Sequence, residues 1–255
     1  MHSVTADLRR ALTTRGFFIG LCLTPLVMLL GAGQSVLPVL LHGAGDGLVN
    51  GFHASLVMEG TVSDAMLFAA PILCALAYTV SFVDDMKSGY IKGCLPRIGK
   101  ASYAKGKAIA CACSGGLTLF IGVWLAYLLF ALIFMPMELA PAPDMPAQPT
   151  FLPILGQACI FFLNGALWSL AGLCMSSCTM NRYMAFASPF IFYYVLVILQ
   201  ERYFHDLYVL NPKNWLTAAG NWPGGAWGLA LFLAVWSLAL CFVFYAVAQR
   251  RLTDA

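Results

Sequence analysis

The sequence predicts an all-α integral membrane protein with six transmembrane helices, an N-terminal amphipathic helix and both termini in the cytosol. Three observations support this prediction. The 255 residues are 61% hydrophobic and 10% charged, with a mean hydropathy of +0.82, whereas soluble domains are about half apolar and a quarter charged. Several apolar runs are long enough to cross a bilayer. The basic residues lie between these runs and not within them.

An amphipathic helix is expected first, over residues 3–15. Apolar residues recur at helical spacing from Val4 to Leu12, while Arg9 and Arg10 fall on the opposite side. A helix with this pattern lies at the membrane surface. A cleavable signal peptide would have its apolar core earlier, followed by a small-residue cleavage site, so the sequence does not predict one here.

Six apolar segments are expected to span the membrane. At a rise of about 1.5 Å per residue, the first of them is long enough to cross the hydrocarbon core even when it is tilted. The expected spans are residues 16–41, 65–83, 108–135, 151–177, 183–199 and 226–248.

The basic residues predict the orientation of these spans. The segments 42–63, 137–150 and the semi-apolar 200–225 would lie outside. Every Lys and Arg except Arg202 and Lys213 then falls on the inner side, in agreement with the positive-inside rule. We therefore expect a multi-pass protein of the plasma membrane, which in a bacterium is the cytoplasmic membrane.

The most basic inner segment is residues 84–107, which follows the second span. Its glycines and Pro96 divide it into short pieces, so we expect one or two brief surface helices and not a flexible tether. Its charge alone is equally consistent with a simple anchor of the membrane topology. The order of its residues suggests a more specific role.

The sequence does not predict a metal site, a catalytic site or an ion-coupled transporter. Cys111 and Cys113 are two residues apart, so on a helix they point in nearly opposite directions. Lys100 and Lys107 follow glycines, but each precedes an alanine where a phosphate loop needs Ser or Thr. The expected spans contain no Asp, Glu, His, Lys or Arg, whereas ion-coupled transporters usually need such groups there. We expect no cofactor in this chain and no nucleic-acid partner.

One stretch resembles a known family. Asp85 precedes the sequence Ser-Gly-Tyr at residues 88–90, and Ser102-Tyr103-Ala104-Lys105-Gly106-Lys107 leads into the third span. This order is similar to the acidic residue, the glycine and the Ser-Tyr-x-x-Gly-Lys element of the ABC-2 type permease family. Members of that family are the membrane subunits of ATP-driven exporters. The layout of six spans with an amphipathic entry helix also resembles that family over the whole chain.

The resemblance implies partners and roles. Residues 84–107 would contain a coupling helix that docks on a separate nucleotide-binding ATPase subunit, which would hold ATP and Mg. Residues 3–15 would be an elbow helix, and residues 200–225 would form short helices that dip into the outer leaflet. A second permease subunit, identical or different, would complete a dimer. The implied coupling residues are Asp84, Asp85, Lys87, Gly89, Tyr90, Arg97, Ser102, Tyr103 and Lys107.

The resemblance also implies a substrate path along the second and fifth spans of two subunits. An aromatic, uncharged path would suit an apolar or amphipathic cargo such as a lipid, a peptide or a drug. For each candidate, plain packing or an interhelical hydrogen bond is the alternative explanation. A stand-alone six-helix channel, or another membrane protein that is not coupled to ATP, is the alternative function. The candidate path residues are Phe68, Ile72, Tyr78, Asn164, Phe190, Tyr193 and Tyr194.

Overall fold

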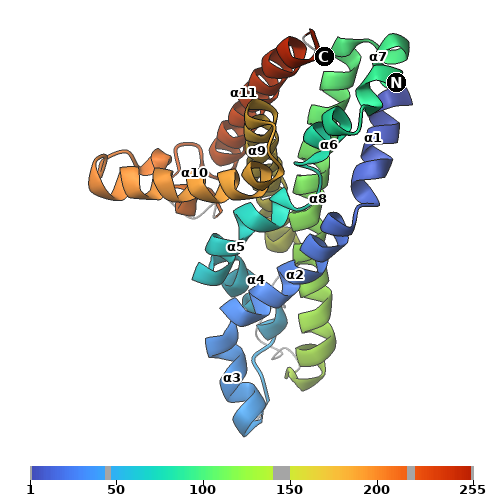
Figure 1. Cartoon of the computed structure of the whole chain (residues 1–255). Coiled ribbons are helices and arrows are strands. Elements are labelled where there is room, and N and C mark those ends of the chain that lie inside the picture. Colours follow the sequence, from blue (N-terminus) through green and yellow to red (C-terminus); the bar gives the residue numbers. More distant parts are fainter. Residues whose placement is uncertain (1, 44–46, 140–149, 217–221, 254–255) are drawn as a thin grey trace.

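The computed structural model describes residues 2–43, 47–139, 150–216 and 222–253 (Figure 1). Within these ranges the regular structure is helical, and one isolated bridge between Leu48 and Glu138 pairs extended backbone. The all-α prediction is confirmed. The helices are α1 His2–Leu12, α2 Arg15–Gly31, α3 Gly33–His42, α4 Phe52–Val62, α5 Asp64–Ala75, α6 Ser81–Lys87, α7 Tyr90–Ile98, α8 Lys100–Phe134, η1 Met135–Met137, α9 Phe151–Thr179, α10 Arg182–Arg202, η2 Tyr208–Leu210, η3 Pro212–Trp215 and α11 Gly225–Thr253.

The described chain has four to six helical segments that could cross a membrane. Four are long and apolar enough by themselves, namely α8 together with η1, α9, α10 and α11. Two bent pairs raise the number to six if each pair is one span: α1 with α2, bent by 53°, and α4 with α5, bent by 70°. These long apolar helices suit a protein embedded in a membrane.

Helices α8 and α9 form the centre of the fold, and α2, α5, α10 and α11 pack around them. The two central helices approach closely because glycines face each other: a Cβ added at Gly165 would collide with the Gly115 carbonyl oxygen. Ser169 Oγ donates a hydrogen bond to the Cys111 carbonyl across the same contact, at 3.1 Å. Small residues and a polar contact are the usual means of joining membrane helices.

The first two predicted spans and the segment between them differ from the structure. The first predicted span, 16–41, is divided into α2 and α3 at Ala32. The predicted outer segment 42–63 contains α4, whose buried residues include Leu56 and Val57 and which packs on α2 and α8. This segment contains no Lys or Arg and was therefore interpreted as an outer loop, but its apolar residues form a helix that buries one face against its neighbours.

The second predicted span, 65–83, is also interrupted. Helix α5 ends at Ala75, residues 76–80 form a turn, and α6 begins at Ser81. The backbone of this turn accepts hydrogen bonds from its neighbours: Thr14 Oγ1, at the N-cap of α2, donates to the Ala77 carbonyl at 2.9 Å, and Ser176 Oγ of α9 donates to the Thr79 carbonyl at 3.0 Å. Irregular backbone at membrane depth needs such partners.

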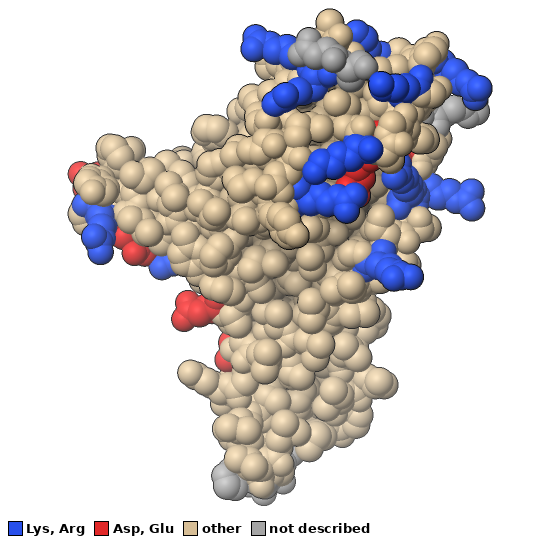
Figure 2. Space-filling view, viewed as in Figure 1, with Lys and Arg blue, Asp and Glu red and all other residues tan. Residues whose placement is uncertain are grey.

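The molecule has one strongly basic end. Figure 1 shows α1, α7 and the last turns of α11 at the same end, and Figure 2 shows that Lys and Arg gather there. We call this the basic end. A second core cluster lies inside it, with Phe82, Tyr103 and Phe244 among its buried residues. Figure 1 also shows α8 running through the length of the molecule and α10 extending to one side.

Candidate coupling site at the basic end

The short helix α7 is held between two glycines in left-handed conformations. Gly89 precedes it with φ of +72°, and Gly99 follows it with φ of +79°. Glycine occupies this region without steric cost, whereas other residues are strained there. A Cβ added at either glycine would point into open space. The role of Gly89 is therefore to form the turn between α6 and α7.

Helix α7 buries one apolar side chain and exposes a polar, aromatic face. Ile91 is buried in the cluster at the basic end, while Tyr90 is 53% exposed and Lys92 and Arg97 are exposed as well. The Arg10 guanidinium lies 5.7 Å from the centre of the Tyr90 ring, a cation–π distance. This surface protrudes at the end of the molecule and is available to another protein.

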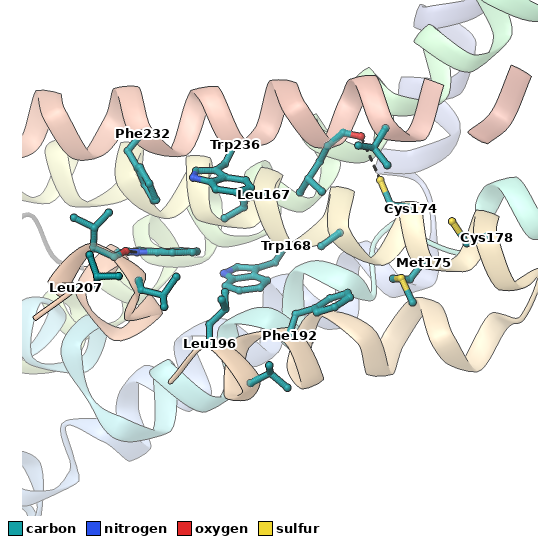
Figure 3. A pocket seen from close by; sticks show the side chains of 17 residues that line it. Leu167, Trp168, Cys174, Met175, Cys178, Phe192, Leu196, Leu207, Phe232 and Trp236 are labelled. Carbon is teal, nitrogen blue, oxygen red and sulfur yellow. Dashed lines mark hydrogen bonds between the residues drawn. The ribbon is translucent and has the colours of Figure 1, made fainter. Parts of the chain in front are cut away.

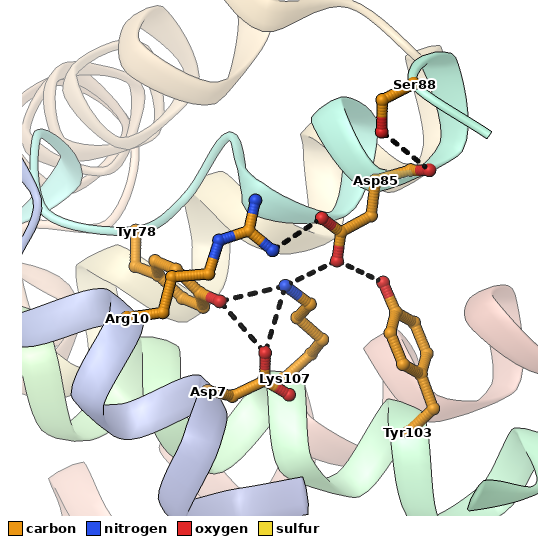
Figure 4. A network of polar contacts seen from close by, with 7 residues as sticks. All are labelled: Asp7, Arg10, Tyr78, Asp85, Ser88, Tyr103 and Lys107. Atoms are coloured by element: carbon orange, nitrogen blue, oxygen red, sulfur yellow. Dashed lines mark hydrogen bonds and ion pairs between the residues drawn. The ribbon is translucent and has the colours of Figure 1, made fainter. Parts of the chain in front are cut away.

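Behind α7, a network of buried polar side chains centres on Asp85 (Figure 4). Its carboxylate lies 2.7 Å from Lys107 Nζ and 2.8 Å from Arg10 Nη1. Tyr103 Oη donates a hydrogen bond to the same carboxylate at 2.7 Å. The Asp85 side chain is 1% exposed and that of Lys107 is fully buried. One carboxylate of α6 thus joins α1 and the beginning of α8.

Lys107 also connects α1 to the turn that interrupts the second predicted span. Its Nζ donates a hydrogen bond to Tyr78 Oη at 2.9 Å and lies 3.3 Å from Asp7 Oδ1. Tyr78 Oη in turn donates to Asp7 at 3.0 Å. The two carboxylates and two cations balance in charge, and the hydroxyl groups complete their hydrogen bonding, as a buried ion network requires.

The charge of Lys107 controls the ionisation of Asp85. Burial alone would raise the pKa of the Asp85 carboxyl group, but the positive charge and hydrogen bond of Lys107, followed by the hydrogen bond from Tyr103, lower this pKa below its ordinary value. The carboxylate therefore stays charged and bonded at neutral pH.

The structure separates the predicted coupling residues into two groups. Lys87, Gly89, Tyr90, Arg97 and Ser102 are exposed. In contrast, the side chains of Asp85, Tyr103 and Lys107 are inside the network, and Asp84 forms an ion pair with Arg182 at 2.7 Å. Asp84 remains partly exposed, but Asp85, Tyr103 and Lys107 are buried and cannot contact another protein in this conformation. They hold α6, α7 and α8 together beneath the exposed surface.

The predicted inner segment 84–107 is shorter than expected. Helix α8 begins at Lys100, so residues 100–107 are its first two turns and not part of a loop. Lys107 was placed at the end of a surface loop, but it lies buried in a helix where Asp7 and Asp85 compensate its charge. Glycine at 99 ends α7 and allows α8 to begin in another direction.

Two members of the network were missed in the sequence. Asp7 and Arg10 lie three residues apart on α1, so they share one side of that helix. The available signal was Asp7 itself, an acidic residue in an otherwise basic amphipathic helix, which indicates a partner for its charge. Its partners Tyr78 and Lys107 are more than 70 residues away, so no local pattern could have identified them.

Four of the predicted path residues form an aromatic cluster where α5 meets α10. The ring centroid of Phe68 lies 5.0 Å from that of Phe190 and 6.0 Å from that of Tyr194, and the rings of Tyr193 and Tyr194 are 5.5 Å apart. Phe68 is 48% exposed and Tyr193 is buried. Ile72 lies one turn after Phe68 and is half-buried. The cluster therefore has both an open side and a packed side.

The other two path candidates lie elsewhere. Tyr78 belongs to the ion network described above. Asn164 is fully buried in α9 and donates hydrogen bonds to the carbonyls of Ile160 and Trp215, the second at 2.7 Å. Gln157, two turns earlier, donates to the Leu216 carbonyl at 2.6 Å. These two side-chain amides hold the segment around η3 against α9. For Asn164, a structural hydrogen bond therefore explains the residue better than a place in the substrate path.

An apolar cleft of about 600 Å³ lies between α9, α10 and α11 (Figure 3). Side chains from these three helices and from the segment around η2 and η3 point into it. This cleft could not be predicted from the sequence, because its walls come from apolar positions on helices that are apolar on all sides. The residues that line it include Trp168, Cys178, Phe192, Leu207, Trp215 and Trp236.

No protein-family model matches this chain, and no curated protein is significantly similar to it. Among the described residues, no group of three or more His, Cys, Asp and Glu side chains is arranged to hold a metal ion. The resemblance to ABC-2 type permeases therefore stays a prediction from the sequence, and the geometry at the basic end is the main basis for a functional proposal.

Proposed function

We propose that this chain is the membrane-spanning permease subunit of an ATP-driven exporter, with the basic end in the cytosol. The observation that supports the proposal most strongly is the linkage of α7 to the rest of the chain. Helix α7 presents an exposed surface between two left-handed glycines, and the segment preceding it is fixed to α1 and α8 through Asp85 and Lys107. A partner that moves α7 also moves these helices.

The proposed partner is a separate nucleotide-binding ATPase that holds ATP and Mg. When the ATPase closes on ATP, it would displace α6 and α7 as one unit. The reason is that the connections at Gly89 and Gly99 are too short for α7 to move independently of its neighbours. The ion network would pass this displacement to α8 and α1. A second permease subunit, identical or different, would complete the transporter in the plasma membrane, which in a bacterium is the cytoplasmic membrane.

The proposed cargo is apolar or amphipathic, such as a lipid, a peptide or a drug. The aromatic cluster of Phe68, Phe190 and Tyr194 supports this class of cargo because it offers rings and no charge, with one side open. Helix α5, which contributes Phe68, runs directly into the turn at residues 76–80 beside the ion network. Movement of α6 would therefore reach the cluster through α5.

Photo-crosslinking from α7 tests the proposed partner. A photoreactive residue in place of Arg97, in cells of the source organism, is expected to capture a protein with a phosphate-loop ATPase motif, identified by mass spectrometry. The matched control is the same residue at Val49, which is exposed and lies shortly before α4; Figure 1 shows α4 far from α7. Capture of no ATPase from Arg97, or equal capture from Val49, would reject the proposal.

An assay with that ATPase then tests the energy source. The permease and its ATPase, reconstituted in lipid vesicles, are expected to move cargo only with ATP. Transport that follows a pH or sodium gradient without ATP would contradict the proposal. Transport down a concentration gradient without any ATPase would instead identify an uncoupled channel.

A further inference from the structure

The cleft between α9, α10 and α11 has the shape of a site for one extended apolar chain. Its lining residues on α9 run from Leu167 to Cys178, which at about 1.5 Å per residue is a length of about 16 Å. This is about half of a hydrocarbon core of roughly 30 Å, the depth of one leaflet. The lining side chains are hydrocarbon, aromatic or sulfur-containing, so the cleft offers an almost entirely apolar surface.

The dimensions of the cleft suit a lipid chain. A volume of about 600 Å³ over that length gives a mean cross-section of about 40 Å². An α-helix with its side chains is at least about 10 Å in diameter, or about 80 Å² in cross-section. An extended acyl chain is much narrower than such a helix, so the cleft can hold one along its whole length.

Two arginines, Arg250 and Arg251, lie at the end of the cleft that is nearest to the basic end. Arg251 Nη2 donates a hydrogen bond to the carbonyl of Cys178, the last lining residue of α9, at 2.6 Å. Arg250 follows Val243 by seven residues, so it continues the cleft-facing stripe of α11 about 10 Å further. Residues 174–183 and 240–253 contain no Asp or Glu, and the next acidic residue after Arg251 in the sequence is Asp254. Arg182 at the nearby turn is already paired with Asp84.

We propose that this cleft binds one anionic glycerophospholipid from the leaflet at the basic end. One acyl chain lies in the cleft against Trp168, Trp236 and Phe192, and the phosphate group lies at Arg250 and Arg251. Guanidinium groups bind phosphate with two parallel hydrogen bonds, and basic groups between membrane helices attract anionic headgroups. The proposal does not rest on coupling to ATP, because it needs only that these helices lie in a bilayer.

Tryptophan fluorescence provides the test, because Trp168, Trp215 and Trp236 line the cleft. The full-length protein is reconstituted in vesicles with brominated acyl chains, which quench nearby tryptophans. Brominated phosphatidylglycerol is expected to quench at a lower mole fraction than brominated phosphatidylcholine. The preference should fall about fivefold for each arginine removed in Arg250→Gln and Arg251→Gln. The control Lys92→Gln/Arg97→Gln removes two exposed charges on α7 and should leave the preference unchanged.

A second pair of variants tests the cleft itself. Val195 lines the cleft from its exposed rim, so Val195→Phe should partly fill it and reduce quenching by both lipids. Ile198, on the same helix and equally exposed, does not line the cleft, and Ile198→Phe is the matched control. Native mass spectrometry of the parent should show one retained anionic lipid that Val195→Phe loses.

Three outcomes would overturn the proposal. Equal quenching by the two lipids in the parent would mean that only ordinary boundary lipid is present. A preference for phosphatidylglycerol that survives Arg250→Gln/Arg251→Gln would place the headgroup elsewhere. Loss of a dimer, and not of a lipid, in Val195→Phe would show that a second copy of the chain occupies the cleft. None of these outcomes bears on whether an ATPase binds α7.

Discussion

Lys107 Nζ lies 2.7 Å from the Asp85 carboxylate, and both side chains are almost completely removed from solvent. The two residues belong to α8 and α6, so their contact fixes the beginning of the longest helix against the segment that leads into α7. A buried pair of this kind adds little stability compared with apolar residues, but breaking it is costly because one charge is left without a partner.

The first prediction concerns this pair. Lys107→Met and Asp85→Leu should each lower the free energy of unfolding by roughly 3–5 kcal/mol, because each leaves a buried charge. The double variant Asp85→Leu/Lys107→Met should be less destabilised than the sum, because Arg10 is 49% exposed and can turn to water. Thermal unfolding of the purified variants in one detergent measures these effects.

Asp84 provides the matched control for that experiment. Its ion pair with Arg182 joins partly exposed side chains, so Asp84→Asn should cost less than about 1 kcal/mol. Additive losses in the double variant, or an equal loss in Asp84→Asn, would mean that the buried network is not the structural link described here.

The second prediction compares two glycines of the same short segment. Gly89 has φ of +72°, so Gly89→Ala should cost about 1–2 kcal/mol and disturb the position of α7. Gly93 lies within α7 with open space around it, so Gly93→Ala should be neutral or slightly stabilising. Binding of the captured ATPase to each variant is the measurement. Equal binding by both variants would show that the conformation at Gly89 does not position the docking surface.

The third prediction concerns pH at the end of the molecule opposite α7. Glu138 accepts hydrogen bonds from the backbone N–H groups of Gly51 and His53 and lies 2.7 Å from His53 Nδ1. Burial alone would raise the pKa of Glu138, but these hydrogen bonds, first of all the one from the His53 backbone, lower it below its ordinary value of 4.5. The carboxylate thereby joins the beginning of α4 to the end of α8.

A lowered pKa in the folded state means that this stabilisation is fully present above the ordinary pKa of a glutamate. It is lost as the pH falls through the lower, folded-state value. The hydrogen-exchange protection factors at the first turn of α4, which correct for the intrinsic pH dependence of exchange, should therefore be high at pH 6 and fall below pH of about 4. Glu138→Gln should remove most of this pH dependence. An unchanged acid response in Glu138→Gln would assign the effect to other groups.

The fourth prediction distinguishes packing from cargo contact in the aromatic cluster. The Tyr193 hydroxyl is buried and has no hydrogen-bond partner among the described residues. Tyr193→Phe should therefore raise the free energy of unfolding by about 1 kcal/mol, because an unpaired buried hydroxyl is removed. If the cluster lines the cargo path, Phe68→Ala should slow transport with little loss of stability, since Phe68 is half-exposed.

Phe186, which lies on α10 but makes none of the ring contacts of the cluster, is the control for this experiment. Transport rate and thermal stability are measured for each variant. If Phe68→Ala and Phe186→Ala change transport equally, the cluster is not a specific path.

The sequence by itself determined the class of this protein and much of its helical content. Composition and run length are properties of the chain alone, and they predicted apolar helices close to α8, α9, α10 and α11. One or two brief helices were also predicted within residues 84–107, because glycines and Pro96 interrupt the local backbone, and α7 is one such helix.

The tertiary structure decided what the charged and interrupted segments do. Asp7 and Lys107 are 100 positions apart in the chain, and their contact arises only because α1 packs on α8. The free carbonyls at the break after Ala75 likewise accept hydrogen bonds from distant residues, namely Thr14 at the N-cap of α2 and Ser176 on α9. Local periodicity describes the faces of a helix. Only the packing of the helices determines which side chains from distant parts of the sequence contact those faces, and therefore which charges are buried.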